Sequence, residues 1–445
     1  MGNATMIDVQ EAYSAAKRLI PGGTSLLSKR PEMILPEQWP TYYSRANGAT
    51  VWDLNERPYL DFYLMGVGAN TLGYACPDID RKVVECIKKG SMCTLNSYEE
   101  VMLAKKLLDL HDWADMARFG KTGGDACAMA VRIARAYSKK DLVLICGYHG
   151  CQDWYLAANL AGADELSAVH LSGLNPIGIP RGLAGTVRAF HYNKLQEFDA
   201  LCSEYGDSIG AVIMEPIRDG EPEAGFLESV REWTEKHDVP LIFDEISLGF
   251  RICPGGSHLV LGVNPDMAVF GKAMSNGYPI SAVIGRGDIM SYAQETFLSS
   301  TFWTERIGFT AANAVCDIYM GRPIVQELDE VGRRVRDIWT RAAENAELGI
   351  SIAGLNPICH FKIISDNDHE RAWMTYFTQT MLEKGFLAAG AFYASTAHDT
   401  NGQIDKYESA CNEAFIDIAR NMARGVSPKQ LLKGPVAHQK FERLT

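Results

Sequence analysis

The stretch Met267-Ala-Val-Phe-Gly-Lys-Ala-Met-Ser-Asn-Gly-Tyr-Pro-Ile280 decides the fold and points to the chemistry. Its four leading apolar residues are typical of a buried strand, and Lys272 stands where that strand runs into a Gly/Ser/Asn loop. In open α/β sheets, ligands bind beyond the carboxyl ends of the strands. A lysine held there with a partly desolvated amine is a candidate for Schiff-base formation, although most lysines with this local pattern are surface residues.

A second apolar strand, Val239-Pro-Leu-Ile-Phe-Asp-Glu-Ile246, ends at Asp244. An acid and an amine at one sheet edge suit pyridoxal phosphate (PLP), whose aldehyde condenses with a lysine and whose protonated ring nitrogen draws electrons. Asp244 would hold that proton, and the ion pair would make its burial tolerable. Taken alone, Asp244 fits a solvated aspartate or a helix N-cap equally well.

Composition bounds the class of protein. The chain has 445 residues, 47% hydrophobic and 22% charged, which is typical of a globular enzyme of two to three domains. A net charge of −12, without a Lys/Arg cluster, argues against a nucleic-acid partner. The 11 cysteines show no C-x-x-C spacing, so neither a disulfide framework nor a metal site is indicated.

The chain shows no targeting signal. The first residues, Met1 to Met6, lack a basic region followed by an apolar one, and no apolar run reaches the roughly 18 residues needed to cross a bilayer. We therefore expect a cytoplasmic protein with reduced thiols and no membrane partner.

Apolar runs alternate with helical periods from about residue 100 to about 330, which predicts a parallel sheet with helices between its strands. The two chain ends show longer helical patterns and shorter strands. We therefore expect a large domain over 61–330 and a small domain built from 1–60 and 331–445. The predicted strands of the large domain are Leu142 to Cys146, Thr186 to Phe190, Ala211 to Met214, Leu241 to Phe243 and Met267 to Phe270.

Glycines precede a predicted helix in Gly120-Lys-Thr-Gly-Gly-Asp-Ala126. The amides of Gly123 and Gly124 would favour an anion such as a phosphate, although an ordinary capped helix fits this segment as well. After the strand ending at Cys146, Tyr148 could stack on a pyridine ring, and His149 follows it. Alone, these two are more often a packing residue and a hydrogen-bonded loop histidine.

Six short motifs together resemble one family, the class III PLP-dependent aminotransferases, and the Pro-Gly-Gly turn ending at Gly23 is similar to the glutamate-1-semialdehyde aminomutase subgroup. The resemblance runs from about residue 12 to 425. The motifs, in order, are Thr122-Gly-Gly-Asp-Ala126, Gly147-Tyr-His-Gly150, Glu215-Pro216, Phe243-Asp-Glu-Ile-Ser-Leu-Gly-Phe-Arg251, Gly271-Lys272 and Ser300-Thr301.

The resemblance implies an α/β fold of the fold type I PLP-dependent transferases: a mostly parallel central sheet in a large domain, plus a smaller α+β domain from both chain ends. It implies a homodimer with shared active sites and a Schiff base at Lys272. Asp244 would pair with the ring nitrogen, and Tyr148 and Ile246 would cover the two ring faces. Further cofactor contacts are implied for Gly123, Gly124, His149, Glu215 and, from the partner chain, Thr301.

Two departures bear on the substrate. Where the aminomutase clamps the substrate carboxylate with an arginine, this chain has Lys29, with Arg30 beside it, and lysine cannot make the planar bidentate contact. Val67 and Asn70 stand where that enzyme has bulkier or apolar residues, which favours a more polar acceptor.

Three functions remain open. The first is an aminotransferase that moves an amino group from a donor such as glutamate to an aldehyde or ketone, for example a sugar intermediate. The second is an intramolecular aminomutase. The third is a non-catalytic cofactor-binding protein, which the intact Lys272 and Asp244 disfavour. A loop over 151–185, dotted with Gly and Pro, resembles a mobile segment over the active site.

Overall fold

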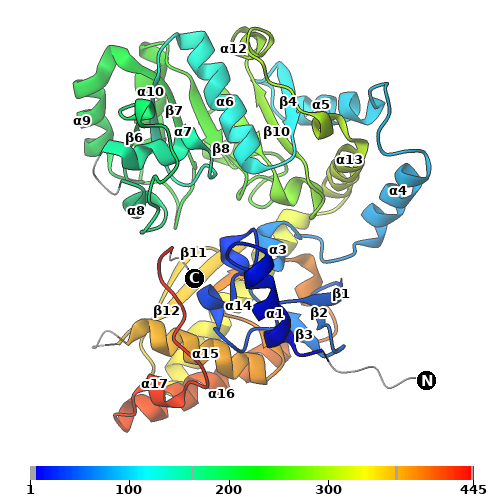
Figure 1. Ribbon diagram of the computed structural model, residues 1–445, viewed down its shortest axis with the longest axis vertical. Helices are drawn as coiled ribbons and strands as arrows, with labels where there is room; N and C mark the ends of the chain where they lie inside the picture. Colours follow the sequence, from blue (N-terminus) through cyan, green and yellow to red (C-terminus); the bar gives the residue numbers. More distant parts are fainter. Residues whose placement is uncertain (1–6, 162–164, 366–368, 442–443, 445) are drawn as a thin grey trace. The chain divides into compact units, whose positions relative to one another are not determined.

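The computed structural model describes residues 7–161, 165–365, 369–441 and 444. Residues 1–6, on which the expected location partly rests, lie outside these ranges. The chain forms two compact units: a large unit over Pro77–Val325, and a small unit that joins Met1–Cys76 to Gln326–Thr445 (Figure 1). Sequence analysis expected the large unit to begin at residue 61 instead.

Pairing between the two chain ends accounts for the difference in the first boundary. Strand β3 (Pro58–Asp61) pairs in parallel with β13 (Phe386–Leu387), and the Phe62 N–H donates to Leu387 O at 2.9 Å. The segment after β3 is therefore part of the small unit. Such pairing between distant residues leaves no local mark in the sequence.

The large unit contains a seven-stranded sheet in the order β4-β10-β9-β8-β7-β5-β6. The strands from β6 to β9 are parallel, which confirms the predicted mostly parallel sheet. The strands are β4 (Met116–Gly120), β5 (Leu142–Cys146), β6 (Val187–Ala189), β7 (Ile209–Met214), β8 (Leu241–Asp244), β9 (Met267–Phe270) and β10 (Ser281–Gly285).

Two strands at the other end of the sheet were not predicted. Strand β10 runs antiparallel to both β9 and β4. Met116-Ala-Arg-Phe-Gly120 lies between two helices, but a charged residue interrupts its apolar run. Ser281-Ala-Val-Ile-Gly285 follows the lysine loop without an intervening α-helix and so breaks the strand–helix alternation of the rest.

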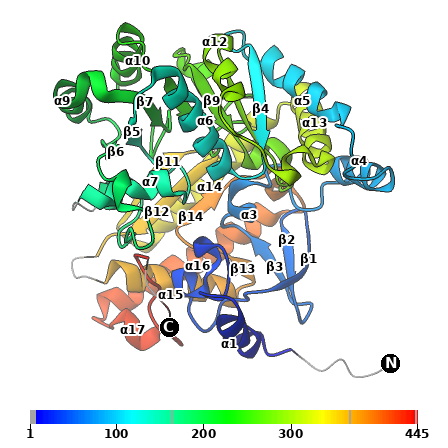
Figure 2. The same ribbon diagram turned by 45° about the horizontal axis from the view of Figure 1, so that its top comes forward.

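Helices cover both faces of this sheet because its strands are apolar on both sides. Helix α6 packs on one face, where Val143 and Ile145 point, and α9 and α10 pack on the other, where Leu144 points (Figure 2). The helices are α4 (Pro77–Lys88), α5 (Tyr98–Asp109), α6 (Gly123–Ser138), α7 (Asp153–Leu156), α8 (Glu165–Val169), α9 (Leu195–Tyr205), α10 (Phe226–Lys236), α11 (His258–Leu261), α12 (Gly287–Met290) and α13 (Arg306–Gly321).

The expected loop over 151–185 is partly helical. It contains α7 and α8, and its side chains Trp154, Tyr155, Leu166 and Val169 are buried in the core beneath α6. These apolar residues anchor the segment. Residues 162–164 lie outside the described part of the chain.

The small unit has two sheets, β1-β2-β3-β13 and β11-β12-β14, packed with helices around an aromatic core. Phe62 stacks on Tyr407 with ring centroids 4.3 Å apart. The strands are β1 (Tyr43–Asn47), β2 (Thr50–Asp53), β3, β11 (Ile350–Leu355), β12 (Ile358–Ile363), β13 and β14 (Ala391–Tyr393). The helices are α1 (Val9–Leu19), α2 (Pro31–Ile34), α3 (Met65–Gly68), α14 (Ile324–Ala346), α15 (Glu370–Glu383), α16 (Gln403–Ala423) and α17 (Pro428–Leu431).

The turn α3 is left-handed. Its φ values are 41° at Met65, 66° at Gly66, 59° at Val67 and 79° at Gly68. A β-branched residue at such a φ is strained. The buried Asp61 holds this turn: its carboxylate accepts hydrogen bonds from the Tyr63 N–H at 2.9 Å, the Tyr74 hydroxyl at 2.6 Å and the Met65 N–H.

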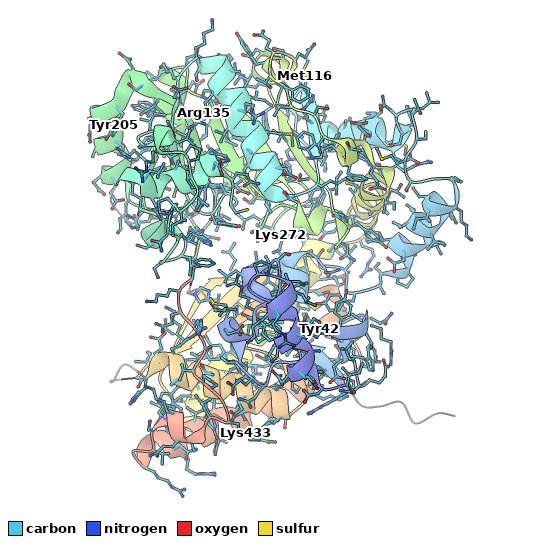
Figure 3. All side chains as sticks on the ribbon, in the orientation of Figure 1. Tyr42, Met116, Arg135, Tyr205, Lys272 and Lys433 are labelled. Atoms are coloured by element: carbon cyan, nitrogen blue, oxygen red, sulfur yellow. The ribbon has the colours of Figure 1, made fainter. Side chains whose placement is uncertain are left out.

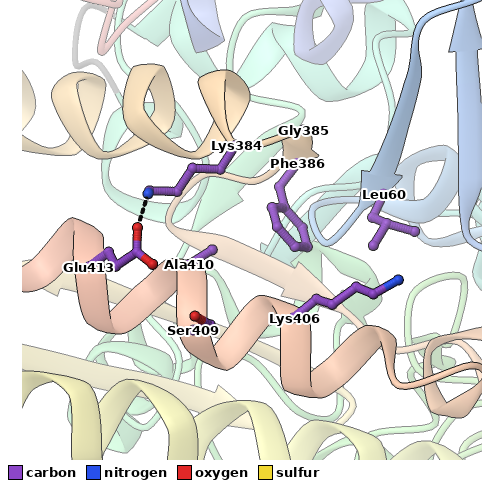
Figure 4. Close-up of a pocket in the computed structure, with 8 residues that line it drawn as sticks. All are labelled: Leu60, Lys384, Gly385, Phe386, Lys406, Ser409, Ala410 and Glu413. Carbon is purple, nitrogen blue, oxygen red and sulfur yellow. Dashed lines mark hydrogen bonds and ion pairs between the residues drawn. The ribbon is translucent and has the colours of Figure 1, made fainter.

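The small unit also contains a surface cavity of about 360 Å³ beside β13 and α16 (Figure 4). Lys406, Ser409 and an ion pair between Lys384 and Glu413 line it. None of the predicted site residues lies in this cavity. Among the described residues, no helix is both long and apolar enough to span a membrane.

Candidate functional site

Lys272 directly follows Gly271 at the end of β9, in the large unit (Figure 3). Its φ is 44°, a left-handed conformation that strains any residue except glycine. Nζ donates to Ser247 Oγ at 2.7 Å. Burial lowers the pKa of the Lys272 amine, and the charge of Arg251 lowers it further. The amine is therefore more often uncharged than in an exposed lysine, and the uncharged form attacks carbonyl carbon.

Asp244 ends the neighbouring strand β8 and is buried, with 3% of its surface exposed. Its Oδ2 accepts a hydrogen bond from His149 Nδ1 at 2.8 Å and one from Cys127 Sγ at 3.4 Å. Its Oδ1 accepts from the Ile246 N–H at 3.1 Å. Three donors from three segments fix the carboxylate in one orientation.

The predicted anion turn begins α6. Thr122 is the N-cap: its Oγ1 accepts from the Asp125 N–H at 3.1 Å, and Asp125 Oδ2 accepts from the Thr122 N–H at 3.2 Å. Gly123 and Gly124 are the first two helical residues, whose N–H groups have no carbonyl partner within a helix. These amides are therefore suited to an anion, and the helix dipole favours negative charge at this end.

Both glycines lie close to the ends of neighbouring side chains. A Cβ atom on Gly123 would lie 2.6 Å from Ile246 Cδ1, and one on Gly124 would collide with the amide of Gln152. Ile246 also lies 3.6 Å from the Cβ position of Gly271, next to Lys272. The Ile246 side chain thus lies between the anion turn and the lysine.

Glu215 follows β7 and forms an ion pair with Arg218. One of its carboxylate oxygens also accepts the Tyr148 N–H at 3.3 Å. Burial raises the pKa of Glu215, and Arg218 opposes that shift. The Tyr148 ring stacks on His170, with centroids 4.1 Å apart, a partner that sequence analysis did not identify.

Three predicted residues remain, Thr301, Lys29 and Arg30. Thr301 is exposed and begins a short 3-10 turn, Thr301–Thr304, of the large unit. Lys29 and Arg30 belong to the small unit. Lys29 is exposed, and its charge acts on the carboxylate of Asp61, whereas the Arg30 guanidinium lies against Gly22 and 5.6 Å from the Phe441 ring centroid.

Cys127, His149 and Asp244 offer a thiol, an imidazole nitrogen and a carboxylate oxygen within 4.8 Å of one another. Such atoms could ligate a metal ion. The hydrogen bonds from Cys127 and His149 to Asp244 already account for their proximity.

Sequence reasoning missed several residues of the site. These side chains reach it from a helix interior, a turn or a loop, and only Ser247 lies within one of the motifs quoted above. Ser247 was the most accessible to prediction, because it lies three residues after Asp244 in the same strand-end turn. The missed residues are Cys127, Gln152, His170, Arg218 and Ser247.

Comparisons with known proteins agree with this geometry. The chain is 32% identical over 385 residues to the 3-aminobutyryl-CoA aminotransferase of Cloacimonas acidaminovorans, covering 84% of this chain and 88% of that protein. It is 33% identical over 352 residues to the glutamate-1-semialdehyde 2,1-aminomutase of Methanothrix thermoacetophila, covering 77% of this chain and 79% of that enzyme.

A similar solved structure is the FumI protein of Sphingopyxis sp. MTA144 in its PLP internal aldimine form. It has a TM-score of 0.84 and 25% identity, and the match covers 95% of this chain and 99% of that one. The family model described as aminotransferase class-III matches residues 36–394. With most of its length matched in this way, the chain belongs to the class III aminotransferases, enzymes that work with PLP.

Proposed function

We propose that this enzyme transfers an amino group between two separate molecules, from an amino-acid donor such as glutamate to a polar aldehyde or ketone, for example a keto-sugar. The observation that carries the proposal is that two groups stand at the ends of adjacent strands. One is the buried Lys272 amine, bonded to Ser247, and the other is the Asp244 carboxylate with its three hydrogen-bond donors. When bound, PLP supplies a reactive aldehyde and a ring that accepts electrons.

The residues at this site fit PLP. The Lys272 amine has a lowered pKa, as covalent attachment to an aldehyde requires. The turn at Gly123 and Gly124 has first-turn amides for a phosphate and carries no side chain that would cover them. Asp244 is a buried carboxylate to which a protonated ring nitrogen supplies the missing positive charge.

Each residue then has a chemical task. Lys272 Nζ holds the cofactor and afterwards carries a proton taken from the donor's α-carbon. Asp244 keeps the ring nitrogen protonated, and Ile246 and Tyr148 cover the two ring faces. Glu215, paired with Arg218, adds negative charge that supports the protonated groups nearby.

We propose a homodimer in which the partner subunit's Thr301 completes the phosphate site. Apolar side chains are exposed around Thr301, and the Arg306 N–H, donating to Ser91 O at 3.0 Å, ties the two segments that carry most of them. A second copy would cover this patch. Its members are Met92, Leu95, Tyr98, Val101, Phe297 and Phe302.

Mixing two inactive variants tests the shared site. Lys272→Ala chains mixed with Thr301→Val chains should form heterodimers, some with one intact site, and so recover part of the wild-type rate. If mixing restores nothing while each variant still dimerises by size-exclusion chromatography, Thr301 acts within its own chain. Thr296→Val is a matched control, because Thr296 Oγ1 donates to Ala293 O within the same unit.

The choice between aminotransferase and aminomutase rests on Lys29 and Arg30. A transaminase must bind two unlike substrates in turn, which a flexible cation suits better than a rigid bidentate fork. Lys29 is exposed, and Arg30 is folded against Gly22. This arrangement favours intermolecular transfer, although an aminomutase is among the relatives.

A half-reaction distinguishes the two functions. The PLP form of the enzyme, given glutamate alone, should release one equivalent of 2-oxoglutarate per active site. An added keto-sugar should then accept the retained amino group, return the enzyme to its PLP form and allow full turnover. The same preparation should isomerise glutamate-1-semialdehyde slowly. Fast isomerisation without added donor would replace this proposal with the aminomutase.

A further inference from the structure

Helix α6 touches the proposed cofactor site at two places. Its first residues, Gly123 and Gly124, present amides at the anion turn, and one turn further along Cys127 reaches Asp244. Cys127 is fully buried, and its Sγ lies 3.4 Å from Asp244 Oδ2. One helix therefore carries the amides proposed for the phosphate and also contacts the carboxylate proposed for the ring nitrogen.

The thiol can act only as a donor toward this carboxylate. Burial raises the pKa of the Cys127 thiol well above its usual range, and the negative charge of Asp244 raises it further. A protonated thiol beside a carboxylate donates its S–H, and hydrogen bonds to a charged acceptor are stronger than neutral ones.

The second donor to the same oxygen is His149, which comes from a loop rather than a helix. His149 lies in the loop Gly147–Gly150, whose end glycines have φ of 124° and 111°. Its Nδ1 bonds Asp244, whereas its buried Nε2 has no hydrogen-bond partner among the described residues. One hydrogen bond to Oδ2 does not by itself fix the rotation of the carboxylate, so the thiol on the same oxygen adds a restraint to those from His149 and from the Ile246 N–H on Oδ1.

We infer that Cys127 is a positioning residue, whose thiol fixes the orientation of Asp244 and couples it to the helix that carries the anion turn. The inference rests on the proposed role of Asp244 at the ring nitrogen. It adds a specific requirement: a hydrogen-bond donor, rather than an apolar group of the same size, is needed at position 127.

Three variants distinguish the effect of losing the hydrogen-bond donor at position 127 from the effect of changing the side-chain volume. Cys127→Ser keeps a donor, Cys127→Val keeps approximate volume without a donor, and Cys316→Val makes the same exchange at a buried cysteine of α13. The measurements are the PLP dissociation constant, the pH titration of the bound cofactor's visible absorption, and the rate of the half-reaction with glutamate.

We expect Cys127→Val to weaken PLP binding about tenfold, the size of one modest charge-assisted hydrogen bond, and to shift the absorption titration. Cys127→Ser should stay within about twofold of wild type, and Cys316→Val should not change either quantity. The inference is overturned if Cys127→Val behaves like Cys316→Val, or if Cys127→Ser is as impaired as Cys127→Val.

A cofactor-free measurement guards against misfolded variants. The infrared S–H band of the apo-protein that disappears in Cys127→Ser should lie at lower frequency than the Cys316 band, and Asp244→Asn should raise its frequency. An unshifted band would show that the thiol does not donate to Asp244. If Asp244→Asn itself leaves PLP affinity and absorption unchanged, the proposed role of Asp244 fails; if only Cys127→Val does so, the inference alone fails.

Discussion

Asp61 and Asp244 are buried aspartates that each end a strand, and they differ in where their hydrogen-bond partners come from. Asp61 ends β3, and its side-chain donor Tyr74 is 13 residues away, with the other donors closer still. Asp244 ends β8, and its side-chain donors His149 and Cys127 are 95 and 117 residues away. Asp61 is thus bound by donors close to it in sequence, whereas Asp244 is bound by side chains from two distant elements.

The difference indicates what each carboxylate does. Local donors hold the left-handed turn after Asp61, and burial raises the pKa of that carboxyl. The hydrogen bonds of Asp61 therefore stabilise a strained backbone conformation. Long-range donors around Asp244 face the strand end that carries Lys272. Substitutions at Asp244 should therefore lower turnover with little change in the free energy of unfolding. Substitutions in the Asp61 region should change the free energy of unfolding instead.

The largest effect is expected for Lys272→Ala. We expect turnover to fall by roughly four orders of magnitude or more, because no other amine replaces Nζ. The visible absorption of the covalently held cofactor should disappear, while phosphate contacts still retain some PLP. Borohydride reduction followed by peptide mapping checks the attachment, with Lys236→Ala as an exposed-lysine control. A label on any other lysine would contradict the assignment.

Next in size is Asp244→Asn. Removing one member of a buried charge pair costs about 3–5 kcal/mol, or roughly 10² to 10⁴ in rate if the loss falls on the reacting state. We expect that loss in kcat, with the thermal midpoint of the apo-protein close to wild type. A variant that turns over near the wild-type rate would remove Asp244 from the mechanism.

His398 sharpens the comparison from the small unit. Its Nε2 donates to the Asp61 carbonyl at 2.7 Å, and burial lowers the pKa of His398 from 6.5 to about 4. Between these values the unfolded chain binds the proton and the folded one does not, so stability falls as pH falls from 6.5 toward 4. The loss approaches about 3 kcal/mol.

Urea unfolding at pH 7 and pH 4.5 measures this contribution. His398→Gln should be less stable than wild type at pH 7 but should lose less on acidification, while PLP affinity at pH 7 stays unchanged. The exposed His237→Gln should lose as much as wild type. Equal acid sensitivity in His398→Gln and wild type would mean that His398 does not stay neutral in the folded protein.

The smallest effect concerns the strained turn. Val67 has φ 59° and ψ 44°, and Asn adopts that conformation more readily. We expect Val67→Asn to raise the unfolding free energy by about 0.5–1 kcal/mol. Val51→Asn, in regular β2, is the control and should destabilise. A destabilised Val67→Asn would show that packing of the valine outweighs its backbone strain.

Sequence patterns predicted what depends on neighbours along the chain. The apolar runs ending at Cys146 and Phe270 coincide with β5 and β9, and Thr122 caps α6 as the glycine turn suggested. Antiparallel β10 escaped prediction because it breaks the strand–helix alternation, and β4 because a charged residue interrupts its apolar run. The small unit's extent escaped because it depends on the pairing of β3 with β13.

The same division applies to the site. The placement of Lys272 and Asp244 was predictable because strand ends are visible in the sequence, and the structure puts the two residues at the ends of adjacent strands. Cys127 was not, since a cysteine inside a helix reads as core and only the three-dimensional approach to Asp244 distinguishes it. Similarly, Tyr148 was expected to face a cofactor ring, and its stacking on His170 depends on the fold of the segment after Cys151.

The left-handed backbone at Lys272 lowers the stability of the fold at the residue that the proposed function requires. Glycine adopts this φ without strain, so Lys272→Gly should fold into a more stable protein than the wild type while being unable to attach its cofactor covalently. Selection for thermal robustness alone would thus discard the lysine, and only selection for catalysis retains it. An engineering screen on this enzyme must therefore score turnover alongside heat resistance.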